Sequence, residues 1–113
     1  MIFSVETNEI KAIVLAAGKG TRMKSEYPKV LHKIFGITLL DRVISILDTD
    51  ETFLIVGHQA DKLEEHINKN IYKQSIKCVL QQPQLGTGHA VSQACKYLKG
   101  FKGTVIILCG DTP

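Results

Sequence analysis

Residues 15–36, LAAGKGTRMKSEYPKVLHKIFG, are the stretch on which the fold of this 113-residue chain depends. An apolar run ending at Ala17 leads directly into Gly18 and Gly20. Glycine lets the backbone turn sharply and approach a ligand closely. The same stretch carries four cations, Lys19, Arg22, Lys24 and Lys29. A buried strand that ends in a glycine-rich, cationic loop is typical of phosphate binding. The alternative is a basic loop that is merely exposed to solvent.

Two better-known glycine motifs do not fit this loop. The dinucleotide-binding fingerprint needs a third glycine, and that position is occupied by Met23. The Walker A motif needs a lysine followed by serine or threonine, whereas Lys19 is followed by Gly20. The sequence therefore indicates a third kind of glycine loop.

Composition places the chain among ordinary globular domains. It is 44% hydrophobic and 22% charged, and its length allows one domain at most. Its net charge of +3 is modest and shows no basic stripe, so we expect no nucleic-acid partner. No apolar run approaches the roughly 20 residues of a membrane span, and we expect neither a signal peptide nor a membrane partner.

Cysteine usage indicates the cellular compartment. Cys78, Cys95 and Cys109 lie far apart and form no CxxC pair, which argues against a zinc site and against a disulfide framework. Reduced thiols are typical of a cytoplasmic protein, which is the localisation we expect.

The hydrophobic pattern predicts strands that alternate with helices. Buried strands are expected at 11–16, 52–56, 76–80 and 104–109, with a further short strand or extended segment at 30–35. Helices are expected at 39–47, 61–71 and 87–98. The second helix would bury Leu63, Ile67 and Ile71 on one face, and Thr87 would be the N-cap of the third.

Such alternation predicts an α/β fold with a mainly parallel sheet and helices on its faces. Residues 1–9 would be an N-terminal tail and residues 10–113 a nucleotide-binding portion. Ligands bind such sheets at the carboxyl ends of the strands. The loops at 16–29, 81–88 and 109–113 all fall there.

The second of these loops begins a polar stretch, QQPQLGTGHA, at residues 81–90. Amide side chains carry donors and acceptors that can recognise the imide edge of a pyrimidine. The alternative is an ordinary polar connection from strand to helix. His89 could serve as an acid or base, but nucleotidyl transfer needs no such base, so we favour an orienting or structural role.

The third loop carries Asp111 directly after Cys109 and Gly110. A carboxylate just past a buried strand suits Mg²⁺, which takes few protein ligands and completes its shell with phosphate oxygens and water. The alternative is a turn or N-cap aspartate. Cys109 could also be a nucleophile, but the sequence offers no neighbour to lower its pKa, and a buried, inert cysteine is favoured.

These three stretches resemble the sugar-nucleotide pyrophosphorylases, whose signature is LxxGxGTRM followed by PKxL. The version in this chain, LAAGKGTRM with PKVL, is most similar to the bacterial N-acetylglucosamine-1-phosphate uridyltransferases (UDP-N-acetylglucosamine pyrophosphorylases). The order QxxxLGTGHA and the ending GDTP, which fits the family pattern GDxP, support the same resemblance.

The resemblance implies a Rossmann-like nucleotidyltransferase fold, a three-layer α/β/α sandwich. It implies transfer of a uridylyl group from UTP to N-acetylglucosamine 1-phosphate, with Mg²⁺ as cofactor, for cell-wall and lipopolysaccharide precursors. Arg22 and Lys29 would be catalytic, and Asp111 would bind the metal. The implied substrate contacts are Leu15, Ala16, Ala17, Gly18, Arg22, Lys29, Gln81, Gly86, Thr87, Cys109, Gly110 and Asp111.

The resemblance also implies that the family's catalytic domain continues beyond this chain. We therefore expect the N-terminal portion of such an enzyme, a possible homo-oligomer at full length, and no hexapeptide repeat of an acetyltransferase domain is present. A split enzyme completed by another chain is an alternative. So are another sugar-1-phosphate nucleotidyltransferase and a nucleotide-binding fragment without turnover.

Overall fold

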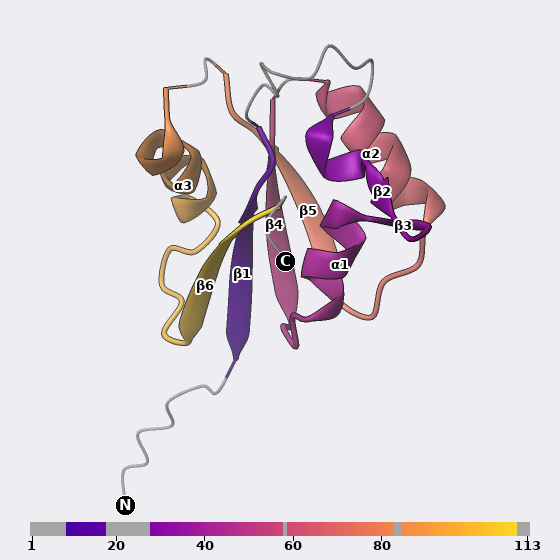
Figure 1. Ribbon diagram of the computed structural model, residues 1–113. Helices are drawn as coiled ribbons and strands as arrows, with labels where there is room; N and C mark the ends of the chain where they lie inside the picture. Colours follow the sequence, from indigo (N-terminus) through magenta and orange to yellow (C-terminus); the bar gives the residue numbers. More distant parts are fainter. Residues whose placement is uncertain (1–8, 18–27, 58, 83–84, 111–113) are drawn as a thin grey trace, which may run out of the picture.

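A four-stranded parallel sheet forms the centre of the molecule (Figure 1). The structure is a computed structural model, and it describes residues 9–17, 28–57, 59–82 and 85–110. The strands are β1 (Ile10–Leu15), β4 (Glu51–Val56), β5 (Ser75–Leu80) and β6 (Thr104–Cys109). They agree with the four predicted strands to within one residue at either end. Their spatial order is β5-β4-β1-β6.

Helices cover both faces of this sheet (Figure 1). The helices α1 (Leu39–Ser45) and α2 (Ala60–Lys69) lie on one face, and α3 (Thr87–Cys95) lies on the other. The predicted three-layer α/β/α architecture is thereby confirmed. Within the described ranges, no helix has the length and apolar character needed to cross a membrane.

The central strands are buried on both sides, so alternate residues enter two separate apolar clusters. The cluster beneath α1 and α2 contains Val14, Leu40, Val43, Ile44, Leu54, Val56 and Leu63. The cluster beneath α3 contains Ile13, Phe53, Ile55, Val79, Ala90 and Ala94. At the edge of this second cluster the ring of Tyr97 stacks on Phe53, with centroids 5.7 Å apart. Continuous apolar strands are what this double burial requires.

The strand order reverses once, and this reversal positions the site. From β1 the chain builds outward through β4 to β5, and then it returns to place β6 on the other side of β1. Crossovers between parallel strands are right-handed, so a connection that runs back across the sheet must place its helix on the opposite face. The helix α3, which connects β5 to β6, lies on that opposite face. The switch point of the sheet therefore lies between β1 and β6, and open α/β sheets bind ligands at the carboxyl ends of the strands at such a point.

The segment at 30–35 is not the single extended piece predicted from the sequence. A short 3-10 helix, η1 (Lys29–Leu31), follows Pro28, and the strands β2 (Lys33–Ile34) and β3 (Ile37–Thr38) then form a hairpin. Its turn is Phe35-Gly36, with φ of 53° and 80°. Two positive φ values match the tight turn that the twist of a hairpin favours. Phenylalanine is rare in such a turn, so Gly36 is the only turn residue of the pair and the turn signal in the sequence is weak.

Helix boundaries also differ from the prediction: α1 ends at Ser45 and α3 at Cys95, whereas the expected helices reached residues 47 and 98. The helix α2 ends at Lys69, because Asn70 is extended at φ −113° and ψ 156°. Ile71 therefore leaves the helical face and is fully exposed, whereas Leu63 is buried as predicted. The N-cap of α3 is Gly86 rather than Thr87, which is the first helical residue and makes no side-chain cap.

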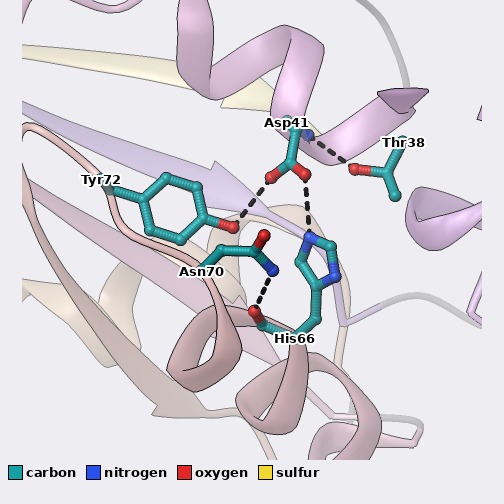
Figure 2. Close-up of polar contacts among 5 residues, drawn as sticks. All are labelled: Thr38, Asp41, His66, Asn70 and Tyr72. Atoms are coloured by element: carbon teal, nitrogen blue, oxygen red, sulfur yellow. Dashed lines mark hydrogen bonds and ion pairs between the residues drawn. The ribbon is translucent and has the colours of Figure 1, made fainter. Parts of the chain in front are cut away.

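A polar cluster fastens α1 to α2 and to the segment that leads into β5 (Figure 2). The Tyr72 hydroxyl donates to Asp41 Oδ1 at 2.8 Å, and His66 Nε2 lies 2.9 Å from Asp41 Oδ2. The backbone N–H of Asp41 donates to Thr38 Oγ1, which caps α1. Burial and the hydrogen bond to Asp41 raise the pKa of Tyr72 well above its usual value. Tyr72 therefore remains a donor throughout the physiological range.

We predict that Asp41→Ala lowers the free energy of unfolding by about 1–3 kcal/mol, because it leaves the Tyr72 hydroxyl and the His66 ring without their acceptor. Urea denaturation followed by circular dichroism measures this loss. The control is Asp48→Ala, at an exposed aspartate just after α1, which should change stability by less than about 0.5 kcal/mol. Equal losses in the two variants would contradict the proposed fastening.

Candidate functional site

The ends of β1 and β6 are joined directly at the carboxyl edge of the sheet. The backbone N–H of Gly110 donates to the carbonyl of Leu15 at 2.9 Å. A Cβ on Gly110 would lie 3.1 Å from Val30 Cγ1 and 3.2 Å from the Leu15 oxygen, so a side chain there would be crowded. The absence of a side chain at Gly110 thus brings together the ends of both strands and η1, whose first residue is the exposed Lys29.

The residues after β1 are held tightly in the sheet. Ala16 donates its backbone N–H to the Ile55 carbonyl at 2.9 Å, and the side chains of Ala16 and Ala17 are buried. The carbonyl of Leu15 and the N–H of Ala16 are therefore already paired within the protein. A ligand that contacts this stretch must use its other backbone groups, and small alanine side chains permit a close approach.

The connection from β5 to α3 is built around one buried amide. Gln81 is only 3% exposed, and its backbone N–H donates to the Val56 carbonyl at 2.7 Å. Its side-chain Nε2 lies 3.0 Å from the Gly86 carbonyl oxygen and 3.0 Å from His89 Nδ1. The far ring nitrogen of His89, Nε2, lies 3.1 Å from Gln93 Nε2. The sequence suggested an orienting role for His89, but it did not reveal that Gln81 is its partner.

The start of α3 presents backbone donors at the same edge. The N–H groups of a helix's first turn have no partner within the helix, and Gly86 provides no side-chain cap. Thr87 and Gly88 are both exposed, and a Cβ on Gly88 would meet no atom within 4 Å. These N–H groups can donate to carbonyl or phosphate oxygens of a ligand, and the partial positive charge of a helix N-terminus also favours such oxygens.

Several predicted site residues lie outside the described part of the chain. These are Gly18, Arg22 and Asp111, together with Lys19 and Lys24 of the glycine loop. Leu15, Ala16, Ala17, Lys29, Gln81, Gly86, Thr87, Cys109 and Gly110 are described. All of the described ones lie in or beside the segments that follow β1, β5 and β6, as the sequence predicts.

The prediction of a buried Cys109 is wrong. Its side chain is exposed, because β6 is an edge strand whose faces are only partly covered by helices. By contrast, Cys78 lies within β5, where burial, and then the nearby charge of Glu64, raise the pKa of its thiol to about 11. A thiol with so high a pKa carries little thiolate near neutral pH and is poorly nucleophilic.

The described residues alone offer no ready-made metal centre. Among them there is no group of three histidine, cysteine, aspartate or glutamate side chains that could hold an ion. A magnesium ion at this edge would therefore depend on Asp111, on phosphate oxygens and on water. That donor set is chemically suited to Mg²⁺, which commonly uses one or two carboxylates together with substrate phosphates.

Comparison with known sequences gives a family match. The family model described as a MobA-like NTP transferase domain matches residues 12–113. A protein named bifunctional protein GlmU from Prochlorococcus marinus (strain NATL2A) is 50% identical over 103 residues, which are 88% of this chain and 22% of that protein. Its namesake from Clostridioides difficile (strain 630) is 45% identical over 106 residues, 91% of this chain and 22% of the relative. The chain thus spans about a fifth of the length of these curated relatives.

Comparison with solved structures agrees. HddC from Yersinia pseudotuberculosis, in complex with GMP-PN, superposes with a TM-score of 0.78 at 30% identity, over 89% of this chain and 47% of HddC. A nucleotidyl transferase from Methanothermobacter thermautotroptrophicus has a TM-score of 0.70 at 23% identity, over 95% of this chain and 52% of its own. At that identity the second match shows the fold alone.

We predict that Gly86→Ala destabilises the chain by about 1–3 kcal/mol, because Gly86 has φ 98° and ψ 179°, a conformation adopted essentially only by glycine. The matched control is Gly88→Ala, two residues further on, in open space within the first turn of α3. It should cost nothing and can add up to about 1 kcal/mol of helix propensity. Thermal unfolding of both variants measures the difference, and a neutral Gly86→Ala would contradict this account.

Proposed function

Because this chain belongs to the MobA-like NTP transferase domain family, we propose that it is the nucleotide-binding part of a uridylyltransferase. The enzyme would transfer the uridylyl group of UTP to N-acetylglucosamine 1-phosphate and release pyrophosphate, supplying cell-wall and lipopolysaccharide precursors. The resemblance drawn from residues 15–36 is confirmed by relatives named GlmU at 45–50% identity. The reaction and both substrates are our proposal.

The observation that carries the proposal is the convergence of three segments at the switch point of the sheet. The ends of β1 and β6 meet through Gly110 and Leu15, and the connection from β5 lies on the same carboxyl edge. The described residues that directly follow β1 and β6 are Ala16, Ala17 and Gly110, whose small size leaves room for a ligand close to the backbone. A nucleotide is the ligand class that such edges bind in open α/β sheets.

The chemistry would depend on positioning and charge rather than on covalent catalysis. A phosphate oxygen of the sugar 1-phosphate would attack the α-phosphorus of UTP in line with the departing pyrophosphate. The attacking group is already ionised, so no general base is required. Arg22 would contact the β- and γ-phosphates with its planar fork, and Lys29 would place a point charge at the α-phosphate or the sugar phosphate. Magnesium bound to Asp111 would neutralise charge on the phosphate oxygens.

Recognition of the base would fall to the segment from β5 to α3. Gln81 offers an amide, and Gly86 and Thr87 belong to the start of α3, where backbone N–H groups can donate to carbonyl oxygens of the base or ribose. The carbonyls of uracil are acceptors of that kind. This assignment leaves the cationic residues of the glycine loop for the phosphates.

One comparison favours keeping a second candidate. HddC, at 30% identity, is described in complex with GMP-PN, a guanine nucleotide analogue, so a protein with this fold can hold a purine. Another sugar-1-phosphate nucleotidyltransferase with a different base is therefore the runner-up. The ranking of nucleotides by affinity separates the two candidates.

We also propose a cytoplasmic location. Cys78, Cys95 and Cys109 are free in the structure, and reduced thiols suit the cytoplasm. A homo-oligomer of the full-length protein remains part of the proposal.

We predict that the chain binds UTP more tightly than CTP, GTP or ATP, and that the binding is weak, with a dissociation constant on the order of 0.1–1 mM. Isothermal titration with each nucleotide, with and without Mg²⁺, gives the ranking. Binding is the readout, because the chain spans about a fifth of its curated relatives. Preference for GTP would favour the runner-up, and no binding of any nucleotide would refute the proposal.

We further predict that Lys29→Ala weakens UTP binding about tenfold, because charge-assisted contacts to phosphate are among the stronger hydrogen bonds. Lys29 is exposed at the start of η1, next to Val30, whose side chain would crowd a Cβ on Gly110. The control is Lys33→Ala, which removes the same charge from an exposed position of the hairpin and should change affinity by less than about twofold. Similar losses in both variants would indicate general electrostatic attraction instead of a contact.

A further inference from the structure

The Gly86 carbonyl fixes which way round the Gln81 amide lies. A carbonyl oxygen can only accept hydrogen bonds, so the Gln81 atom 3.0 Å from it must be the amide nitrogen, Nε2. The same carbonyl also accepts from the backbone N–H of Ala90 at 3.0 Å, which holds it in place at the start of α3. The amide nitrogen and oxygen of a glutamine have nearly the same size, so their positions are assigned from their hydrogen-bond partners. Here the Gly86 carbonyl makes that assignment for Gln81.

The same argument fixes the tautomer of His89. Nδ1 of His89 lies 3.0 Å from Gln81 Nε2, and an amide nitrogen can donate but not accept. Nδ1 must then be an unprotonated acceptor, so the neutral ring carries its proton on Nε2. That proton needs an acceptor. The Gln93 atom 3.1 Å from it is the amide nitrogen Nε2, which cannot accept, so the Gln93 amide must be turned by 180° to place Oε1 there. A directed chain of hydrogen bonds runs from Gln81 through His89 to Gln93.

Both hydrogens of the Gln81 amide are consequently used inside the protein. One goes to Gly86 and the other to His89, while no donor among the described residues bonds to Gln81 Oε1. Because Gln81 is 3% exposed, its side chain has little room to adopt another rotamer. What this amide can still offer a ligand is its oxygen, which is an acceptor.

An acceptor distinguishes pyrimidine bases from one another. Uracil carries a hydrogen on N3, between two carbonyl groups, whereas N3 of cytosine is itself an acceptor. An amide that offers only oxygen pairs with uracil N3–H and repels cytosine N3. If the second amide hydrogen were free, the same glutamine could donate to cytosine N3 as well, and the selection would be lost.

From this geometry we propose that His89 is a positioning residue for base selection. By engaging the second hydrogen of the Gln81 amide, it leaves that amide an acceptor only, and so selects a nucleotide whose base carries an imide N–H. This inference rests on the proposed function, since it requires that Gln81 meets the base. It adds to that proposal the residue His89, protonated on Nε2, which accepts a hydrogen bond from the Gln81 amide.

Two substitutions of His89 separate this role from a merely structural one. His89→Leu removes the acceptor, whereas His89→Asn keeps one, because the asparagine Oδ1 can occupy the place of Nδ1. We expect His89→Leu to reduce the ratio of UTP affinity to CTP affinity about tenfold, since an unmatched polar group in a buried site costs that much, and His89→Asn to restore most of it. Isothermal titration with both nucleotides gives the ratios, and circular dichroism verifies that each variant is folded. An unchanged ratio in folded His89→Leu would overturn the inference.

A probe nucleotide tests the same point without any substitution. In N3-methyl-UTP the imide hydrogen is replaced by a methyl group, so the unaltered chain should bind it at least about tenfold more weakly than UTP. Equal affinity for the two nucleotides would also overturn the inference.

Nuclear magnetic resonance of the unliganded chain keeps this inference distinct from the proposed function. Nitrogen-15 shifts of the His89 ring should show a neutral ring protonated on Nε2, and a proton on Nδ1 would overturn the inference whatever nucleotide binds. The expected tautomer with no binding of any nucleotide would refute the proposed function and the selective role together. Nucleotide binding with the same UTP preference in His89→Leu would refute the selective role alone.

Discussion

The pairing of β6 with β1 is the interaction on which the rest of the structure depends. It is closed at the carboxyl edge by the hydrogen bond from Gly110 to Leu15. Because β6 lies beside β1 and not beyond β5, the switch point of the sheet lies between these two strands, where such sheets bind ligands. The same return of the chain requires α3 on the opposite face, and α3 brings His89 to the buried amide of Gln81.

The middle of each strand forms the hydrophobic core, whereas the residues just past its end form the candidate site. The middle residues of β1 and β4 are apolar and enter the clusters on both faces, where hydrophobic burial provides most of the stability. The residues just past the strand ends carry glycine, alanine and a few polar side chains. Such residues add little to the core, so the sheet can hold this edge in place while leaving its backbone and amide groups available to a ligand.

The sequence predicted what depends on local pattern. All four strands of the sheet are continuous apolar runs, and double burial makes such runs unmistakable. Three features were missed, two because their local sequence signal is weak and one because it depends on the strand order of the sheet. The Phe35-Gly36 turn has no usual turn residue at its first position, Ile71 follows a helix end set by Asn70, and Cys109 is exposed because β6 is an edge strand. For the site, the described residues after β1, β5 and β6 lie at the carboxyl ends of their strands, as the strand pattern predicted, but the contact between Gln81 and His89 requires side-chain geometry.

Gly86 links backbone conformation to the chemistry of the base. Its carbonyl accepts both the Ala90 N–H, which begins α3, and the Gln81 amide, so helix initiation and amide orientation share one oxygen. That oxygen takes its direction from a backbone conformation that residues with a Cβ rarely adopt. Gly86 has no side chain that could contact a base. Its backbone nevertheless determines which hydrogen bond the Gln81 amide can offer. Gly86 therefore contributes to the selection of the base as well as leaving space for a ligand. A search that considered only side chains able to contact the base would miss this backbone contribution.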